Sequence, residues 1–260
     1  MIDDRYEGLK LKIPKESDDY QQCSQFVTSS VDEIIGNSIK TGRNKIIINT
    51  NLRHGIPMEN VNKIAGPFVE AWAHEVFIEV LEDENNKYRL INVEAGERLN
   101  MADVILQFKR ERKHQTFVTG SVDVKATSQD IENSGKSPNI TSYARIRTMY
   151  LKDPDYIFVI LSLKHKVLSQ RDPKTELMMG VMEVIDFNAY DLKYLSSSDI
   201  SYNPALGSGQ LQVRDIHYVT IEYRDVWQFC QLLDGKFLNS KKGFDVWMEY
   251  AVKNEWIKDE

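Results

Sequence analysis

Apolar residues recur every three or four positions in several segments of the chain, and this spacing predicts amphipathic helices. One such segment covers residues 18–39, and a longer one covers residues 59–81. Pro67 interrupts the longer segment, so we expect a break near Gly66 and a better helix from Pro67 onward. Two shorter segments with helical spacing are residues 142–151 and 244–256.

Strand-like segments fill the rest of the chain. Residues 117–127 alternate with period two and residues 101–108 are β-rich, so the charged residues 109–114 between them predict a hairpin tip. Residues 155–163 are apolar throughout, which is typical of a central strand buried on both faces. Further strands are expected at 45–50, 90–93, 177–187, 209–213 and 217–222, and polar loops at 51–57, 128–141 and 196–208. This pattern predicts an α/β fold, and the lack of a linker-like segment favours a single domain over residues 1–260.

Composition limits the class of protein. The chain has 260 residues, 42% of them hydrophobic, which supports a real core. Cys23 and Cys230 are far apart and lack CxxC spacing, which favours a reducing cytoplasm and argues against a structural zinc. We find neither an apolar run of membrane-spanning length nor an export signal at the N-terminus. The net charge of −6 does not exclude DNA binding, because a local basic cleft is what matters.

Two carboxylates and a lysine fall on the two strands of the predicted hairpin. Asp123 and Lys125 are two residues apart, so both side chains point to one face of their strand. The hairpin returns Asp103 beside them. Converging carboxylates form a hard-oxygen site suited to Mg²⁺, and the adjacent ammonium can hold a phosphate or a water. Asp-x-Lys is a common tripeptide that alone usually marks an exposed strand edge, but Asp103 lies in an apolar strand where an unpaired charge is costly.

Asp103 and Asp123-x-Lys125, on a hairpin between two helices, resemble the core of the PD-(D/E)xK nucleases. Three stretches are more closely similar to type II restriction endonucleases of the HincII kind: 102–106 (Ala-Asp-Val-Ile-Leu), 122–127 (Val-Asp-Val-Lys-Ala-Thr) and 137–140 (Ser-Pro-Asn-Ile). Ala102 stands where the family name expects proline; because that proline contributes no ligand, the departure puts little in doubt. The resemblance implies a restriction-endonuclease-like core at about residues 60–190, with a mixed central β-sheet flanked by helices.

Three further segments extend the resemblance to a blunt-cutting member of this group over most of the chain. They are residues 46–52, 62–67 and 201–207. What this implies is hydrolysis of both strands of double-stranded DNA at the palindrome GTTAAC, cut in the middle to leave blunt ends with 5′-phosphates.

The resemblance also implies roles for the three residues. Asp103 and Asp123 would bind Mg²⁺, for which Mn²⁺ can substitute, with the backbone carbonyl of Val124 as a candidate third ligand. The metal would stabilise charge developing on the scissile phosphate. Lys125 would position the attacking water and contact the phosphate. Since its neighbouring carboxylates favour the protonated form, positioning is preferred to a general-base role.

Acidic residues near this triad are further candidates. Glu70 lies on the helix before the hairpin and is a candidate supporting catalytic acid, or else a solvent-facing glutamate on an amphipathic helix. Glu94 and Glu97 are weaker candidates, because both fit ordinary loop charges equally well.

Two loops are candidate DNA-reading segments. The first, at about 130–140, leaves the catalytic strand and leads into the next helix. In it, Asn139 is suited to pair two-pronged with adenine and Lys136 to contact a phosphate or guanine; alternatively, Asn139 or Thr141 caps the following helix. The second, at about 200–212, has glycines that permit close approach to a groove or serve a plain turn. The candidate residues of both loops are Lys136, Ser137, Asn139, Thr141, Asn203, Ala205, Gly207, Ser208, Gly209 and Gln210.

Basic residues outside these loops are candidate phosphate contacts, or merely solvated surface. They are Arg53, His54, Arg145, Arg147 and residues 109–113.

A palindromic duplex target implies a symmetric homodimer, because two identical sites must meet two antiparallel strands. A restriction enzyme also needs a companion DNA methyltransferase, expected genetically rather than as a bound partner. Two other functions stay open. One is a structure-specific PD-(D/E)xK repair or recombination nuclease. The other is a non-catalytic DNA-binding protein in which the triad is a structural ion-pair network.

Overall fold

The computed structural model describes residues 4–96, 101–110, 116–205 and 207–258. They form two compact units, each assembled from segments far apart in the sequence. The first unit comprises Met1–Gln21, Lys136–Ile157 and Leu192–Glu260, and the second comprises Gln22–Gly135 and Phe158–Asp191. The single domain expected from the sequence stays a prediction.

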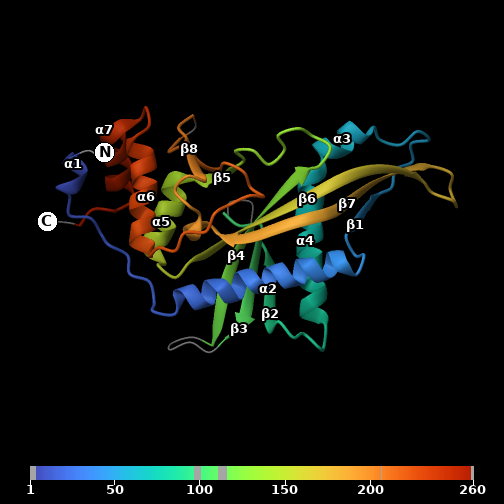
Figure 1. The fold of residues 1–260 in the computed structure, drawn as a ribbon, viewed down its shortest axis with the longest axis horizontal. Helices are drawn as coiled ribbons and strands as arrows, with labels where there is room; N and C mark the ends of the chain where they lie inside the picture. The colour runs from blue at the N-terminus through green and yellow to red at the C-terminus, as the bar shows by residue number, and fades with distance from the viewer. Residues whose placement is uncertain (1–3, 97–100, 111–115, 206, 259–260) are drawn as a thin grey trace. The chain divides into compact units, whose positions relative to one another are not determined.

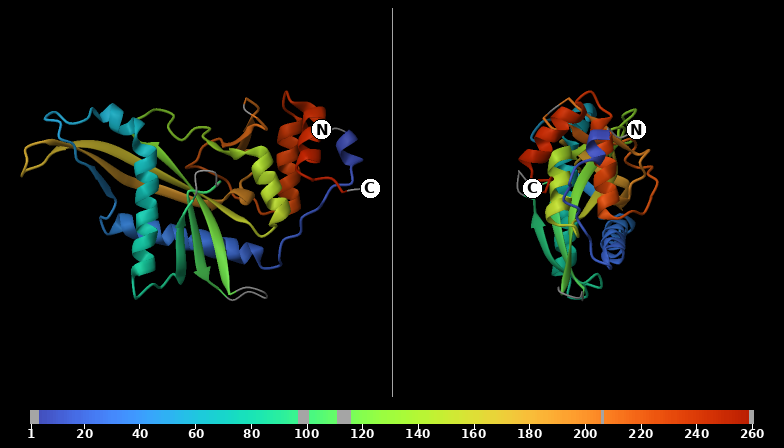
Figure 2. Two further views of the ribbon diagram at one scale, coloured as in Figure 1. Left: turned by 180° about the vertical axis from the view of Figure 1, so that it is seen from behind. Right: turned by 90° about the vertical axis from the view of Figure 1, so that its left-hand side faces the viewer.

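The second unit is built on a six-stranded sheet with the strand order β1-β7-β6-β4-β3-β2. Figure 1 shows α2 (Tyr20–Lys40) crossing in front of this sheet, and Figure 2 shows α4 (Ala65–Glu82) in front when the molecule is seen from behind. The strands are β1 (Lys45–Ile48), β2 (Leu90–Ala95), β3 (Val104–Lys109), β4 (Phe117–Ser128), β6 (Ile157–Arg171) and β7 (Met178–Asp191). This arrangement confirms the predicted mixed central sheet flanked by helices.

The register of the β3–β4 hairpin decides which residues face each helix. Val104 pairs with Val122 and Leu106 pairs with Gly120. The Gly120 face packs against α2, because a Cβ atom at Gly120 would lie only 2.4 Å from Cγ1 of Val27. Strand alternation therefore turns Asp123 to the opposite face, where α4 contacts β2 and β4.

The predicted break in the second long helix is confirmed. A short helix, α3 (Met58–Lys63), ends before Ile64, and α4 begins directly after it at Ala65. Pro67 therefore lies in the first turn of α4. It is tolerated there because the amide that it lacks would have no partner within the helix.

The first unit combines a three-stranded sheet, in the order β5-β9-β8, with the terminal helices. Its strands are β5 (Asn139–Ser142), β8 (Ile200–Asn203) and β9 (Gln210–Val213). Its helices are α1 (Asp4–Glu7), α5 (Tyr143–Lys152), the 3₁₀ turn η1 (Leu192–Tyr194), α6 (Val226–Leu238) and α7 (Gly243–Lys253). Aromatic rings fill the core between the helices, with Tyr143, Phe237 and Trp247 all fully buried.

The structure corrects several predicted elements of the first unit. Strands β5 and β8 lie in segments expected to be loops, and residues 217–222 form no strand beyond one isolated bridge, between Leu195 and Ile221. Helix α6 lies outside every predicted segment. Its start was nevertheless marked in the sequence, because Asp225 and Gln228 form a reciprocal capping box.

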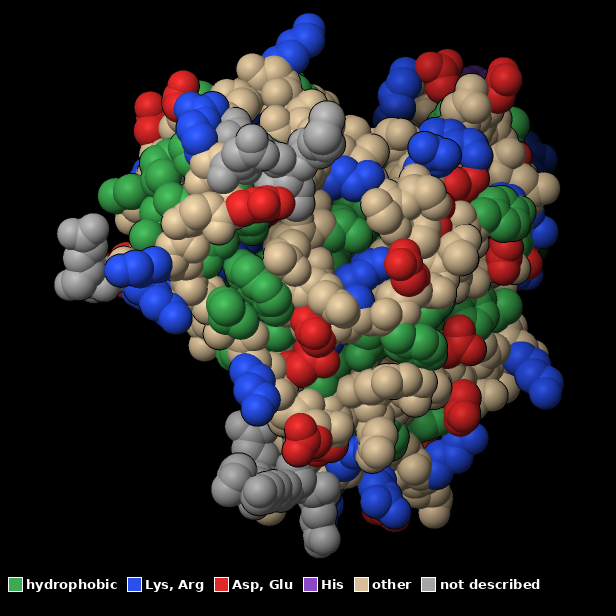
Figure 3. All heavy atoms as spheres, turned by 60° about the vertical axis from the view of Figure 1, so that its left-hand side comes forward, with side chains coloured by type: hydrophobic (Ala, Val, Ile, Leu, Met, Phe, Trp, Pro, Cys, Tyr) green, Lys and Arg blue, Asp and Glu red, His purple; other side chains and the backbone are tan. Residues whose placement is uncertain are grey.

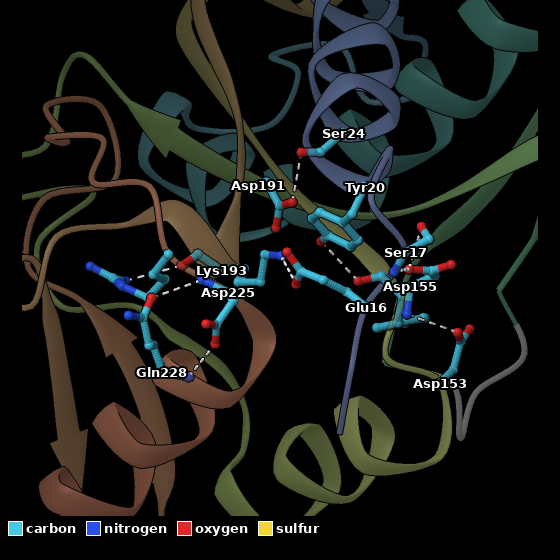
Figure 4. A network of polar contacts seen from close by, with 12 residues as sticks. Glu16, Ser17, Tyr20, Ser24, Asp153, Asp155, Asp191, Lys193, Asp225 and Gln228 are labelled. Carbon is cyan, nitrogen blue, oxygen red and sulfur yellow. Dashed lines mark hydrogen bonds and ion pairs between the residues drawn. The ribbon is translucent and has the colours of Figure 1, made fainter. Parts of the chain in front are cut away.

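A buried lysine anchors the 3₁₀ turn of the first unit. Lys193 is fully buried, forms an ion pair with Glu16, and holds its ammonium 3.2 Å from the centre of the Tyr20 ring (Figure 4). Burial raises the pKa of Glu16, and the ion pair with Lys193 opposes that shift. This pairing satisfies the buried charge and so has a structural explanation.

No helix in the described part of the chain is long and apolar enough to cross a membrane.

Candidate active site

The end of the β3–β4 hairpin holds the first carboxylate of the predicted pair. The backbone N–H of Asp103 donates to the carbonyl of Val122 at 2.9 Å, which continues the register by one residue beyond β3. The carboxylate then accepts a hydrogen bond from the backbone N–H of Val124 at 2.7 Å. Asp103 is thereby fixed beside the strand that carries Asp123 and Lys125.

The second carboxylate, on β4, is almost completely buried. Asp123 is 3% exposed, and the ammonium nitrogen of Lys125 lies 2.7 Å from each of its oxygens. Only the contact with Oδ1 has hydrogen-bond geometry, so Oδ2 is buried without a hydrogen-bond partner. Burial raises the pKa of Asp123 to about 7; Lys125 opposes the shift, and the negative charges of Asp103 and Glu70 add to it.

Glu70 lies within electrostatic reach of Asp103, Asp123 and Lys125. It is half-buried on α4, and burial raises its pKa. Asp103 reinforces that shift and Lys125 opposes it. Glu94 is instead exposed and accepts a hydrogen bond from Asn92 at 2.7 Å. Glu97 lies outside the described residues.

The donor set fits a Mg²⁺ ion that is completed by its substrate. Among the residues that the structure describes, no group of three or more His, Cys, Asp or Glu side chains is arranged to hold a metal. Mg²⁺ is usually bound through one or two carboxylates together with substrate phosphates and waters. Oδ2 of Asp123 is buried without a hydrogen-bond partner, although the ammonium of Lys125 lies 2.7 Å away, and Asp103 supplies a second carboxylate for a cation.

The first predicted reading segment ends in β5, and its residues from Lys136 onward belong to the first unit. Lys136 forms an ion pair with Asp215, and the N–H of Ser137 donates to the carbonyl of Arg214 at 3.1 Å. Asn139 is exposed at the start of β5, whereas Thr141 is only 6% exposed. Asn139 and Ser137 are therefore accessible for recognition, while the side chain of Thr141 belongs to the core.

The second predicted reading segment connects β8 to β9 in the same unit. Ser208 is buried, and its hydroxyl accepts a hydrogen bond from the N–H of Ala144 at 3.1 Å, which caps α5. Gly209 lies against Tyr202, where a Cβ atom would come within 2.2 Å of the phenol oxygen. Ser208 and Gly209 thus have structural explanations; a structural alternative had been predicted for the glycines but not for Ser208.

The remaining residues of this segment are at least partly accessible. Asn203 accepts a hydrogen bond from the N–H of Ala205 at 3.0 Å, and Ala205 and Gly207 are exposed. Gln210 is partly exposed on β9.

One predicted phosphate contact is wrong. Arg147 is fully buried on α5, where its guanidinium bonds to Asp234 at 3.2 Å and stacks near the rings of Trp227 and Trp256. A residue in the core cannot contact a DNA backbone. The helical turn explains the difference, because residues two apart on a helix point to nearly opposite sides, and Arg145 on the same helix is exposed.

The other candidate phosphate contacts lie at the surface or fall outside the residues that the structure describes. Arg53 and His54 are exposed in the loop before α3, and Lys109 is exposed at the end of β3. Residues 111–113 lie outside the described residues. Figure 3 shows Lys and Arg side chains interspersed with Asp and Glu over the face drawn, rather than gathered in one area.

Gln212, a cross-strand neighbour of Asn139, was not among the residues predicted from the sequence. Gln212 on β9 pairs with Asn139 on β5, and its amide nitrogen donates to the Asn139 side-chain oxygen at 3.0 Å. The signal was present in the strand predicted at residues 209–213, because alternation puts Gln210 and Gln212 on one face.

Comparison with known proteins agrees with the resemblance seen in the sequence. The family model described as type II restriction endonuclease HpaI matches residues 7–255. A curated relative, the type II restriction enzyme HpaI of Haemophilus parainfluenzae, is 56% identical over 256 residues, which cover 98% of this chain and 100% of that enzyme.

Proposed function

Because this chain belongs to the HpaI family of type II restriction endonucleases and is a site-specific endonuclease, we propose that it hydrolyses both strands of double-stranded DNA at GTTAAC with Mg²⁺. The cut lies in the middle of the palindrome and leaves blunt ends with 5′-phosphates. The target sequence rests on the relatedness to HpaI, and the chemistry rests on the site.

One observation supports the chemistry above the others. A carboxylate that is 3% exposed has one oxygen without a hydrogen-bond partner and lies beside a second carboxylate and a lysine. Lys125 lies 2.7 Å from both oxygens but leaves Oδ2 without a hydrogen bond. A purely structural ion-pair network would be expected to complete that hydrogen bond, because unsatisfied buried polar atoms are costly. A site that awaits a cation and an anionic substrate explains the pattern.

We assign a separate role in hydrolysis to each residue of the site. Asp103 and Asp123 would hold Mg²⁺ or Mn²⁺, with the carbonyl of Val124 as the proposed third ligand, and Glu70 would support the site from α4. When bound, the metal stabilises charge that develops on the phosphate and lowers the pKa of a water. Lys125 donates to the phosphate and orients the water.

In the hydrolysis, the water oxygen forms a bond to phosphorus while the bond from phosphorus to the 3′ oxygen breaks. The leaving oxygen takes up a proton to become a 3′-hydroxyl, and the 5′-phosphate remains on the other fragment. The hydrogen bond from Lys125 to Asp123, at 2.7 Å, holds the ammonium in place before the substrate binds. Its orientation toward the phosphate therefore does not have to be established during the reaction.

Recognition is assigned to accessible residues of the two reading segments. We propose Asn139, Ser137 and Gln210 as base or groove contacts, with Asn203, Ala205 and Gly207 beside them. Lys136, Arg53 and Arg145 supply phosphate contacts. Thr141 and Ser208 position these segments from within the fold. The enzyme acts as a homodimer in the cytoplasm, alongside a methyltransferase that modifies the same site.

Cleavage of a plasmid with one GTTAAC site tests this proposal. Lys125→Ala and Asp103→Asn should each lower kcat by at least about 100-fold, because each removes stabilisation of the transition state. Lys166→Ala is the matched control, since that lysine lies on β6 in an ion pair with Glu183. Cutting by Lys125→Ala at the wild-type rate would overturn the assignment, as would cutting without a divalent metal.

A further inference from the structure

A β-bulge turns Asn139 toward the surface. Asn139 pairs with Gln212, but Thr141 pairs with Leu211, so Ile140 is an extra residue in β5. In a regular strand Asn139 and Thr141 would share one face. Here Thr141 is buried while Asn139 is exposed, which is the re-aiming of a side chain that bulges produce next to functional sites.

A cross-strand hydrogen bond orients the exposed amide of Asn139. Gln212 lies directly across the strand pair and donates from Nε2 to Oδ1 of Asn139 at 3.0 Å. An asparagine amide has one oxygen with two lone pairs and one nitrogen with two donors. The bond from Gln212 uses one lone pair, which leaves one lone pair and both N–H groups for a ligand.

This arrangement matches one base edge. In the major groove, adenine presents the N7 acceptor beside the N6 amino donor, so a bidentate partner must offer a donor and an acceptor in a set order. Guanine presents two acceptors there and would face the Asn139 oxygen with a like group. If the Asn139 amide were reversed, its N–H donor and its oxygen acceptor would change places, and they would no longer pair with N7 and the N6 amino group of adenine.

The two strands that carry this pair are fastened together near the start of α5. The N–H of Tyr143 donates to the carbonyl of Gly209 at 3.1 Å. The hydroxyl of Ser208 lies 2.8 Å from that of Ser142 and also caps α5. The pair therefore lies on a braced element, and such elements hold recognition groups more accurately than free loops do.

We propose that Gln212 is a specificity-determining residue, which selects adenine by holding the Asn139 amide in the orientation that pairs with the N6/N7 edge. The inference rests on the proposed function and deepens it. Gln212 acts through Asn139, so it is a positioning residue and its loss should relax sequence discrimination more than it lowers metal-dependent hydrolysis.

The test compares kcat/KM on a GTTAAC duplex with kcat/KM on duplexes in which each A·T pair is replaced in turn by G·C. Gln212→Met keeps the side-chain length and removes the amide, so the discrimination ratio at one A·T position should fall on the order of 10-fold. Gln212→Glu should lower it further, because a carboxylate accepts the Asn139 N–H and turns the amide around. Gln231→Ala on α6 is the control and should keep the wild-type ratio.

A double-variant cycle separates this role from a general structural one. Asn139→Ala should relax discrimination at the same position as Gln212→Met, and the double variant should lose no more than Asn139→Ala alone, because both changes remove one interaction. A wild-type ratio in both Gln212 variants, or a double variant that loses the sum of the two effects, would overturn the inference and leave the proposed function intact. Absence of cleavage by the wild-type protein at any duplex would overturn the proposed function and the inference with it.

Discussion

Replacing Asp123 by asparagine should stabilise the metal-free protein while abolishing cleavage. The carboxylate is 3% exposed, and one of its oxygens has no hydrogen-bond partner. An amide of the same shape carries no charge, so the burial cost of ionisation disappears. The variant should therefore be more stable but inactive, as expected where a buried charge serves ligand binding and destabilises the protein without the ligand.

The magnitude follows from the pKa. Burial raises the pKa of Asp123 from 3.8 to about 7, a difference of about 3 units that corresponds to ~4 kcal/mol. The native protein binds this proton more tightly than the unfolded chain does. The contribution to stability is therefore complete below about pH 4 and is lost as the pH rises through 7.

The two proteins should accordingly have similar stability near pH 4 and diverge as the pH rises. At pH 8 without metal, Asp123→Asn should be more stable by up to ~4 kcal/mol, or on the order of 10 °C in Tm for a chain of this size. Thermal unfolding in EDTA at both pH values measures the difference. Asp186→Asn, at an exposed aspartate on β7, is the matched control and should show no such divergence.

Addition of Mg²⁺ at pH 8 gives a second readout. A cation bound by Asp123 should raise the Tm of the wild-type protein, because a ligand that binds the native state stabilises it, and should raise that of Asp123→Asn much less. If Asp123→Asn were no more stable than the wild type at pH 8 without metal, the burial argument would be refuted.

Three further substitutions test other parts of the account. Asp234→Ala leaves the guanidinium of Arg147 buried without its partner and should cost about 3–5 kcal/mol in urea unfolding, whereas a cost near zero would contradict the buried pair. Ser208→Ala removes the cap of α5 and should cost about 1 kcal/mol; an unchanged unfolding midpoint would argue against the cap. Arg53→Ala should reduce the slope of log K against log salt for duplex binding in Mg²⁺-free buffer by about 1. An unchanged slope would show that Arg53 does not contact a phosphate.

The long elements of the fold were predictable because each has a strong local pattern. The helical spacing at 18–39 and the alternation at 117–127 match α2 and β4 within two residues at each end. Four-residue strands such as β5 and β8 have too few positions to show a period. Both pair with β9, which follows β8 closely but lies far from β5 in the sequence. Their turn-like composition therefore indicated loops.

The predicted triad was placed on a paired hairpin, because alternation and pairing alone bring Asp103, Asp123 and Lys125 to one face. The fates of Arg147 and Ser208 could not be predicted, because each depends on a partner that is distant in the sequence. Asp234 lies 87 residues after Arg147. Ser208 caps a helix that begins 65 residues earlier, at Tyr143. Exposure of a charged or hydroxyl side chain is a property of tertiary packing, which a single sequence does not display.

Digestion of unmethylated phage DNA by the purified protein, with Mg²⁺ and with EDTA, tests the central claim most directly when the fragment ends are sequenced. We expect discrete fragments only with Mg²⁺, all ending in the blunt half-site GTT or AAC with a 5′-phosphate, and intact DNA with Lys125→Ala. A smear without a common end sequence, or intact DNA with the wild-type protein in Mg²⁺, would contradict the account.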